Sequence, residues 1–169
     1  YKLTFNMEGL VTEYDYEAIV LRDGEIVKVP TLTEVEDLHI DQLGDMEAFV
    51  TSGGTSTAPY TLQGKVTNYE YKTIRFPGHA AQMKIFKGLW REDKVNVPGG
   101  EVRPKDVFNK VFGPELAKFE DLDLCAVRGV GHGTKNGNKA RIQIDIFDKQ
   151  CETTGFTSME RLTGFSASI

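Results

Sequence analysis

Hydrophobic and polar residues alternate along much of the chain in runs short enough to be strands. Residues 16–30, "YEAIVLRDGEIVKVP", contain two β-branched runs, one on either side of Asp23-Gly24. This dipeptide favours the tight turn of a β-hairpin, so we expect a hairpin here. Residues 36–40, "EDLHI", and 46–52, "MEAFVTS", predict further strands.

The stretch that follows changes from a strand pattern to a helix pattern. In residues 69–74, "YEYKTI", every second position repeats an aromatic or β-branched residue, as in a strand with one buried face. Pro77 then suits the first turn of a helix, which we expect to run to about Leu89. Arg75 therefore stands where the strand ends, with His79 four residues on.

The strongest hairpin is expected near the C-terminus. Residues 122–132, "LDLCAVRGVGH", and 139–150, "KARIQIDIFDKQ", are joined by the turn residues 135–138, "KNGN". Ile142, Ile144 and Ile146 occupy alternate positions, and the pattern predicts that they form one buried face.

Helices are fewer than strands. We expect one over residues 6–14 with Asn6 as its N-cap, a second near 104–111, and a last one that starts near Thr157, whereas residues 53–64 have loop composition. The pattern predicts an α+β fold with a large, mostly antiparallel sheet and a few helices packed on one face. We interpret residues 1–169 as a single domain. Both ends fall within expected elements, so we expect a piece of a longer protein.

Charge and composition exclude several classes of protein. The formal net charge of −5 disfavours a nucleic-acid surface, which needs clustered Lys and Arg. No apolar run reaches the ~18 residues of a membrane span, so no membrane partner is expected. The two cysteines, Cys125 and Cys151, have no motif spacing, which favours a reduced, cytoplasmic setting.

The sequence supports neither a dinucleotide-binding loop nor a metal site. In residues 129–137, "GVGHGTKNG", the third glycine of a dinucleotide loop is replaced by Thr134, and a strand follows where a helix is needed. We interpret this segment as a hairpin turn. The histidines His39, His79 and His132 have no metal-ligand spacing, so no metal site is expected.

Arg75 and His79 are the candidate residues for binding a ligand. A guanidinium binds a carboxylate through two parallel hydrogen bonds, and a helix N-terminus favours an anion. From the residues alone, Arg75 is compatible both with a site that binds a carboxylate ligand and with a simple salt bridge inside the protein. A serine hydrolase that uses Ser52 or Ser56 with His79 is a further alternative, but the G-x-S-x-G turn that exposes a serine nucleophile is absent.

Four stretches in one order resemble a known family. "YKTIRFPGHAAQM" is similar to its Y-K-T-[IL]-R-[YF]-P-G-H segment, and "MEGLVTEYDYEAIVLRDGEIVKVPTL" to its first helix and hairpin. "EAFVTSGGTST" and "FTSMERLTGFSASI" resemble two further family segments. On these motifs, residues 5–169 resemble the saccharopine dehydrogenase-like and lysine 6-dehydrogenase-like enzymes.

The resemblance implies an NAD(P)-dependent oxidoreductase that acts on the carbon–nitrogen bond of lysine or saccharopine. Family members carry an N-terminal Rossmann domain that binds NAD or NADP, and the present chain resembles the substrate-binding and dimerisation domain that follows it. The resemblance therefore implies a homodimer and a chain that is inactive without its Rossmann domain. A non-catalytic ligand-binding or structural dimer module derived from the same family is the alternative.

The resemblance also implies roles for individual residues. The expected substrate-binding residues are Thr73, Arg75, Phe76, Gly78, His79, Thr51 and Ser52. Arg75 would bind a substrate carboxylate together with backbone N–H groups at the start of the helix, and His79 would contact substrate or assist proton transfer as the catalytic residue. Glu13 and Tyr14 are further acid–base candidates if the first helix faces the cleft.

Overall fold

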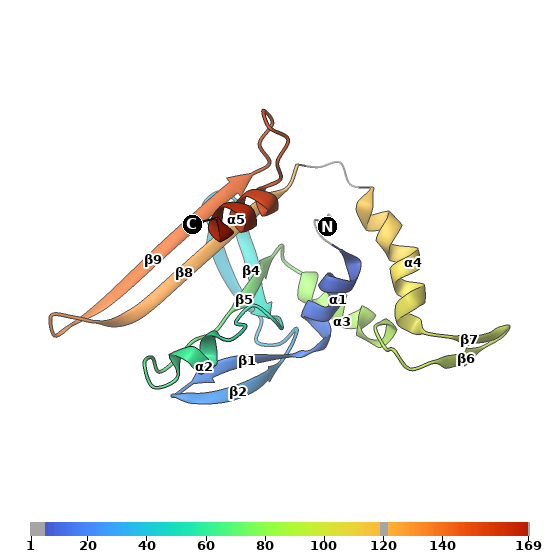
Figure 1. Cartoon of the computed structure of the whole chain (residues 1–169), viewed down its shortest axis with the longest axis horizontal. Coiled ribbons are helices and arrows are strands. Elements are labelled where there is room, and N and C mark those ends of the chain that lie inside the picture. The colour runs from blue at the N-terminus through green and yellow to red at the C-terminus, as the bar shows by residue number, and fades with distance from the viewer. Residues whose placement is uncertain (1–5, 119–121, 169) are drawn as a thin grey trace. The chain divides into compact units, whose positions relative to one another are not determined.

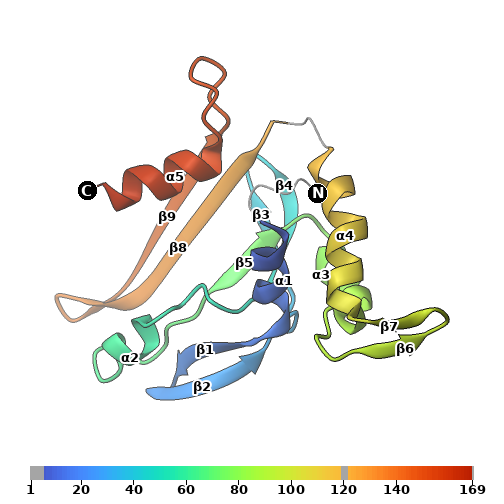
Figure 2. The same ribbon diagram turned by 45° about the vertical axis from the view of Figure 1, so that its right-hand side comes forward.

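The computed structural model describes residues 6–118 and 122–168, and the chain divides into two compact units. Of the described residues, we term 6–117 the N-terminal unit, and 118 with 122–168 the C-terminal unit. Figures 1 and 2 show the helices and strands of both. The interpretation of residues 1–169 as one domain stays a prediction.

The N-terminal unit contains helices and short antiparallel strands. In chain order its elements are α1 (Met7–Asp15), β1 (Glu17–Arg22), β2 (Glu25–Pro30), β3 (Glu36–Ile40), β4 (Gly44–Val50), α2 (Ala58–Leu62), β5 (Lys72–Arg75), α3 (His79–Phe86), the 3-10 turn η1 (Lys87–Leu89), β6 (Val95–Val97), β7 (Gly100–Val102) and α4 (Pro104–Ala117). The C-terminal unit contains β8 (Leu124–Lys135), β9 (Asn138–Lys149) and α5 (Ser158–Ala167).

Local signals set the limits of the first helix and hairpin. The Asn6 side chain accepts a hydrogen bond from the Gly9 N–H at 2.6 Å, which satisfies one of the unpaired donors at the start of α1. Asp23 and Gly24 turn β1 into β2 with φ angles of 50° and 83°. Both features confirm the sequence-based expectation.

An extended segment joins the two sheets that lie near the candidate site. Tyr69 exchanges two backbone hydrogen bonds with Leu21 of β1, at 3.0 and 2.9 Å. Three residues further on, the same segment becomes β5 and pairs with β4, in a sheet of order β3-β4-β5. The hairpin β1–β2 is thereby tied to the strand that carries Arg75.

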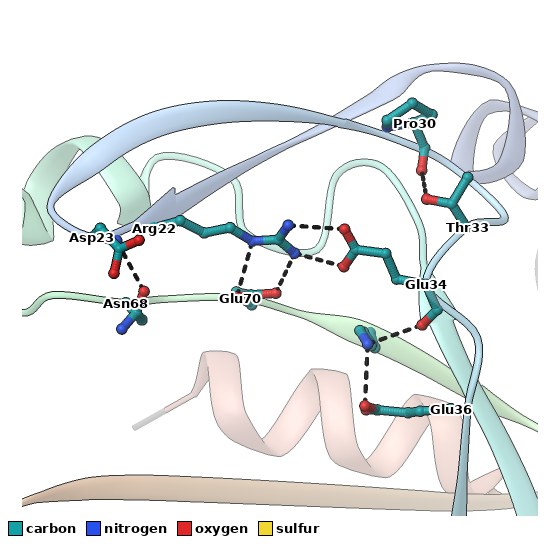
Figure 3. A network of polar contacts seen from close by, with 9 residues as sticks. Arg22, Asp23, Pro30, Thr33, Glu34, Glu36, Asn68 and Glu70 are labelled. Carbon is teal, nitrogen blue, oxygen red and sulfur yellow. Dashed lines mark hydrogen bonds and ion pairs between the residues drawn. The ribbon is translucent and has the colours of Figure 1, made fainter.

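A cluster of charged side chains reinforces this connection (Figure 3). The guanidinium of Arg22 in β1 donates to both carboxylate oxygens of Glu34, at 2.8 and 2.6 Å, and to those of Glu70, at 3.1 and 2.6 Å. Lys72 donates to the Glu34 carbonyl oxygen at 2.9 Å. Hydrogen bonding to Arg22 lowers the pKa of Glu34.

The core of the N-terminal unit is assembled from α1 and the neighbouring strands. Ala18, Val20, Val29 and Val50 form one buried cluster. Tyr14, Phe49 and Trp90 are buried beside the candidate site. The Tyr14 ring meets the rings of Phe49 and Trp90, and the Trp90 ring also meets that of Phe108.

The C-terminal unit is a long hairpin with one helix. β8 and β9 pair in register from Leu124↔Lys149 to Lys135↔Asn138. Thr157 and Glu160 form a capping box at the start of α5, and the Asp123 carboxylate accepts from the Ser158 N–H at 3.0 Å and the Ser158 hydroxyl at 2.6 Å. The expected hairpin and its closing helix are confirmed.

The α+β class with antiparallel pairing is confirmed. The strands, however, are divided among several small sheets, whereas one large sheet was expected. In the described residues they form three two-stranded sheets and one three-stranded sheet in place of one large sheet. Residues 53–64 are not all loop, because α2 forms a short helix with Pro59 in its first turn. The hairpin β6–β7 was not foreseen, although Pro98-Gly99-Gly100 between valines is a turn signal.

The predicted burial of the isoleucine face is wrong. Ile142, Ile144 and Ile146 do lie on one face of β9, but they are exposed. A two-stranded hairpin has no second layer of its own to cover that face. Across the described residues, no helix combines the length and apolar composition needed to cross a membrane.

Candidate functional site

A line of three polar side chains connects one strand and two helices of the N-terminal unit. The Tyr14 hydroxyl of α1 lies 3.0 Å from Nε2 of His79, the first residue of α3. Arg75 Nε, at the end of β5, donates to the same hydroxyl oxygen at 3.4 Å. The fold therefore brings Arg75 and His79 to one phenol that is 61 and 65 residues away in the sequence.

Aromatic rings hold this line in place. The His79 ring stacks on Phe49 of β4 with centroids 6.0 Å apart and planes 13° from parallel, and it meets Tyr14 edge-on at 5.8 Å. Trp90 lies 6.0 Å from Tyr14 on another side. With Tyr14 fully buried and His79 only 8% exposed, neither ring has room to rotate away.

Burial keeps the histidine neutral. Desolvation, assisted by the positive charge of Arg75, lowers the pKa of His79 to about 4. Desolvation also raises the pKa of Tyr14, against the opposing influence of Arg75. At neutral pH both groups are uncharged, so Tyr14 and His79 act as a hydrogen-bonding pair beside the cationic Arg75.

The pKa of Glu13 moves in the opposite direction to that of His79. Desolvation raises the pKa of its half-buried carboxyl group, and the charge of Arg75 partly offsets the rise. A carboxyl group whose pKa moves toward neutrality is better suited to exchange protons at physiological pH than an ordinary glutamate. Its neighbour Tyr14 contacts Arg75 and His79, and the acid–base roles of Glu13 and Tyr14 stay predictions.

Glu47 was missed by the sequence reasoning, and it anchors the start of α3. Its carboxylate accepts from the Gly78 N–H at 2.9 Å and from the Ala80 N–H at 2.6 Å. Gly78 adopts a left-handed φ of 90°, which glycine tolerates without strain. These amides, expected to bind a substrate carboxylate, thus already bind a carboxylate of the protein. An acidic residue within the apolar run of β4 was the available signal.

Two threonines and a tyrosine lie along the neighbouring strands. Thr51 and Thr73 are both buried, and their hydroxyl oxygens are 2.7 Å apart. The Thr73 hydroxyl also lies 3.4 Å from the Tyr71 hydroxyl. A Cβ on Gly54 would fall 2.0 Å from Cδ1 of Tyr71. The Tyr71 ring therefore packs directly on Gly54, in space that any side chain at position 54 would occupy. Tyr71 is a residue that the sequence analysis did not assign.

The remaining predicted residues differ in their surroundings. Ser52 donates its hydroxyl hydrogen to the Thr12 carbonyl at 2.8 Å and its N–H to the Glu13 carbonyl at 2.9 Å, which anchors β4 to the end of α1. Its hydroxyl is committed to the backbone, which weakens the hydrolase alternative. Phe76 is 57% exposed just after β5.

Residues 129–137 do not fit a dinucleotide loop. Residues 129–137 form the end of β8 and its turn, as expected, and no helix follows whose amides would hold a phosphate. Among the described residues, no group of three or more His, Cys, Asp or Glu side chains is arranged to hold a metal ion. The site is therefore a cluster of hydrogen-bonding and charged side chains within the N-terminal unit.

A comparison with protein families agrees with these features. The family described as the saccharopine dehydrogenase C-terminal domain matches residues 1–169, the whole chain. The resemblance noted in the sequence is thereby confirmed, and it identifies full-length relatives as oxidoreductases of amino-acid metabolism. This chain belongs to the saccharopine dehydrogenase C-terminal domain family.

Proposed function

We propose that this chain is the substrate-binding and dimerisation domain of an NAD(P)-dependent oxidoreductase that acts on the carbon–nitrogen bond of lysine or saccharopine. Membership of the family supports an oxidoreductase. The observation that carries the substrate-binding role is the hydrogen-bonded line Arg75–Tyr14–His79, in which a cation is held at fixed geometry beside two neutral hydrogen-bonding groups.

Arg75 is the proposed carboxylate-binding residue. Its Nε donates to Tyr14 and its Nη1 to the Ile74 carbonyl at 3.2 Å, and these bonds set the direction of the guanidinium. A pre-oriented guanidinium loses little entropy when it binds a carboxylate through two hydrogen bonds. Because Glu47 holds the amides of Gly78 and Ala80, the proposed substrate contact comes from the Arg75 side chain and not from the start of α3.

The other side chains orient the substrate or move protons. Neutral His79 is a hydrogen-bonding contact for the substrate, since a pKa of about 4 makes it a weak base at neutral pH. Glu13, whose pKa is raised, is the better candidate to accept the proton of the substrate amine. Thr51, Thr73 and Phe76 complete the proposed site, and Tyr71, directly before β5, extends it.

NAD or NADP belongs to the proposal as a cofactor bound by another domain of the full-length protein. When bound, the nicotinamide supplies hydride chemistry, and the protein supplies orientation and electrostatics. The 169-residue chain alone is accordingly expected to be inactive. The proposed location is cytoplasmic, because the two cysteines, Cys125 and Cys151, have no motif spacing in the sequence.

The test is nicotinamide reduction by the full-length protein with lysine, saccharopine and related amino acids. Arg75→Ala should raise KM for a carboxylate substrate by roughly 10- to 100-fold, the value of a hydrogen bond to a charged group. Arg103→Ala, which removes an exposed arginine paired with Asp106 at 3.0 Å, is the matched control and should leave KM unchanged.

Each contrary result has a distinct meaning. An unchanged KM in a stable Arg75→Ala variant would overturn the role of Arg75. Binding of cofactor without turnover of any tested amino acid would point to a different amine substrate. Failure to bind cofactor at all would favour the alternative, a non-catalytic ligand-binding or dimer module.

A further inference from the structure

Glu47 lies directly beside Arg75 in the sheet β3-β4-β5. The register pairs the two residues across β4 and β5, and residues directly opposite each other in an antiparallel pair point to the same face. Both charges reach His79: besides desolvation, the main influence, the positive charge of Arg75 lowers its pKa and the negative charge of Glu47 raises it. A negative charge of the protein therefore stands next to the guanidinium that we assign to the substrate carboxylate.

The Glu47 carboxylate is fixed in this position. The residue is only 7% exposed, and its two oxygens accept from the N–H groups of Gly78 and Ala80 at 2.9 and 2.6 Å. A guanidinium and the amides at the start of a helix both favour anions, so together they could hold two neighbouring carboxylates. Here the protein itself supplies one of the two, because Glu47 fills the position at the amides.

The surface beyond Glu47 is acidic as well. On β3 the register places Asp37 opposite Glu47 and His39 opposite Asp45, so these side chains share the face that carries Arg75. A hollow of about 530 Å³ is lined by Asp37, Leu38, His39, Asp45, Met46 and Pro77. None of these lining residues is a lysine or an arginine, and the His39 ring is held by Asp45 at 2.8 Å.

The lysine of β5 belongs to the other face of the sheet. Successive side chains of a strand alternate between faces, so Lys72 points away from the face of Thr73 and Arg75. Its ammonium group binds the Glu34 carbonyl at 2.9 Å and the Glu36 carboxylate at 3.2 Å. β5 therefore contributes one cation, Arg75, to the face of the site.

We propose that Glu47 is a specificity-determining residue, which limits the site to substrates with one carboxylate, at Arg75, and a neutral or cationic group over Glu47. The substrate class is a monocarboxylic amino acid with a distal amine, such as lysine, in preference to a substrate with further carboxylates, such as saccharopine. A second carboxylate over Glu47 would be repelled by Glu47 and Asp37 and would find both amides occupied. The proposal rests on the proposed function, since it requires that Arg75 binds a carboxylate.

Three ligands of equal chain length test the charge at the distal end. Hexanoate, 6-aminohexanoate and adipate share one carboxylate, and their other end is a methyl group, an ammonium group or a second carboxylate. Isothermal titration of each ligand into the full-length protein, with and without NAD or NADP, gives Kd without turnover. Adipate should bind about tenfold or more weakly than 6-aminohexanoate, because a fixed, poorly solvated carboxylate repels a second one.

Two variants assign this discrimination to its source. In Glu47→Gln it should fall about tenfold, because the charge is removed and an NH₂ group cannot accept from an amide. Asp37→Asn is exposed and leaves the start of α3 intact, and it should reduce the discrimination about threefold, since exposed charges are screened. Glu25→Gln removes the same charge at the exposed start of β2 and is the matched control, with no change expected. If Glu47→Gln fails to fold, the wild-type ratio and Asp37→Asn decide the question.

The outcomes separate this proposal from the proposed function. Adipate that binds the wild type as tightly as 6-aminohexanoate would overturn the proposal, and so would discrimination that neither Glu47→Gln nor Asp37→Asn reduces. In both cases, loss of ligand binding in Arg75→Ala would leave the carboxylate site of the proposed function in place. Ligands that do not bind, or whose Kd is the same in Arg75→Ala, would overturn both.

Discussion

The Tyr14 hydroxyl lies 3.0 Å from His79 Nε2, and this contact joins the first helix of the chain to the helix that follows β5. Both rings are buried, so bulk water does not readily replace this hydrogen bond. Tyr14→Phe keeps the ring and leaves a buried imidazole nitrogen without this partner, which should lower the free energy of unfolding by about 1–3 kcal/mol.

Urea unfolding of the variant and the wild type measures this difference. Tyr16→Phe is the control, since that side chain is 57% exposed and its hydroxyl can bond to water. Equal unfolding midpoints for Tyr14→Phe and Tyr16→Phe would show that the contact contributes no stability.

The low pKa of His79 predicts a specific pH dependence of stability. Burial and Arg75 lower the pKa to about 4 in the folded protein, whereas the unfolded chain has a value of about 6.5. Between these values the unfolded state binds more protons than the folded state, so the stabilisation is complete above pH ~6.5 and falls as the pH falls toward 4. The loss should not exceed about 3 kcal/mol.

Unfolding curves at several pH values between 7.5 and 4.5 test this prediction. In His79→Gln the decline in stability over this range should be smaller than in the wild type. His132→Gln, which removes an exposed histidine of the other unit, should retain the wild-type decline. Parallel declines in all three proteins would refute the assignment to His79.

The Glu47 carboxylate should be a large contributor to the stability of α3. Glu47→Gln removes the negative charge and replaces one acceptor oxygen by an NH₂ group, which cannot accept from Gly78 or Ala80. We expect a loss of roughly 1.5–3 kcal/mol, because hydrogen bonds to a charged group are the stronger class and the helix N-terminus favours an anion.

The matched control for Glu47 is Glu25→Gln, at the exposed first position of β2. Chemical denaturation of both variants gives the comparison, and hydrogen exchange at the Ala80 amide reports on the cap directly. Unaltered exchange at Ala80 in Glu47→Gln would rule out the capping role.

Gly54 should resist substitution because of Tyr71. The Cβ of Gly54→Ala would fall 2.0 Å from the Tyr71 ring, so the ring must move, at an expected cost of about 1–3 kcal/mol. Gly88→Ala is the control, since a Cβ there meets no atom within 4 Å.

A double-mutant cycle isolates the cause. In a Tyr71→Ala background the ring is absent, and Gly54→Ala should then have little effect on the unfolding midpoint. An equal cost in both backgrounds would mean that the backbone at Gly54, and not contact with Tyr71, limits the substitution.

Sequence alone determined the features that depend on neighbouring residues. Asn6 caps its helix as expected, and the last helix starts near Thr157 as expected, because the donors that these two side chains satisfy lie three residues away. Asp23-Gly24 and Asn136-Gly137 form their turns because the required positive φ angles are local properties of those residues. The quoted motifs were also sufficient to recognise the family.

Tertiary structure decided what depends on distant partners. The sequence singled out Arg75 and His79 and named Tyr14 as a further candidate, but it did not show that the Tyr14 phenol connects the other two. It also missed Glu47, which occupies the amides assigned to the substrate. Alternation predicted that Ile142, Ile144 and Ile146 share a face, but whether that face is covered depends on which layer packs against it. Periodicity specifies the side on which a residue lies, whereas burial, pKa and contact are set by segments that the chain brings together only when it folds.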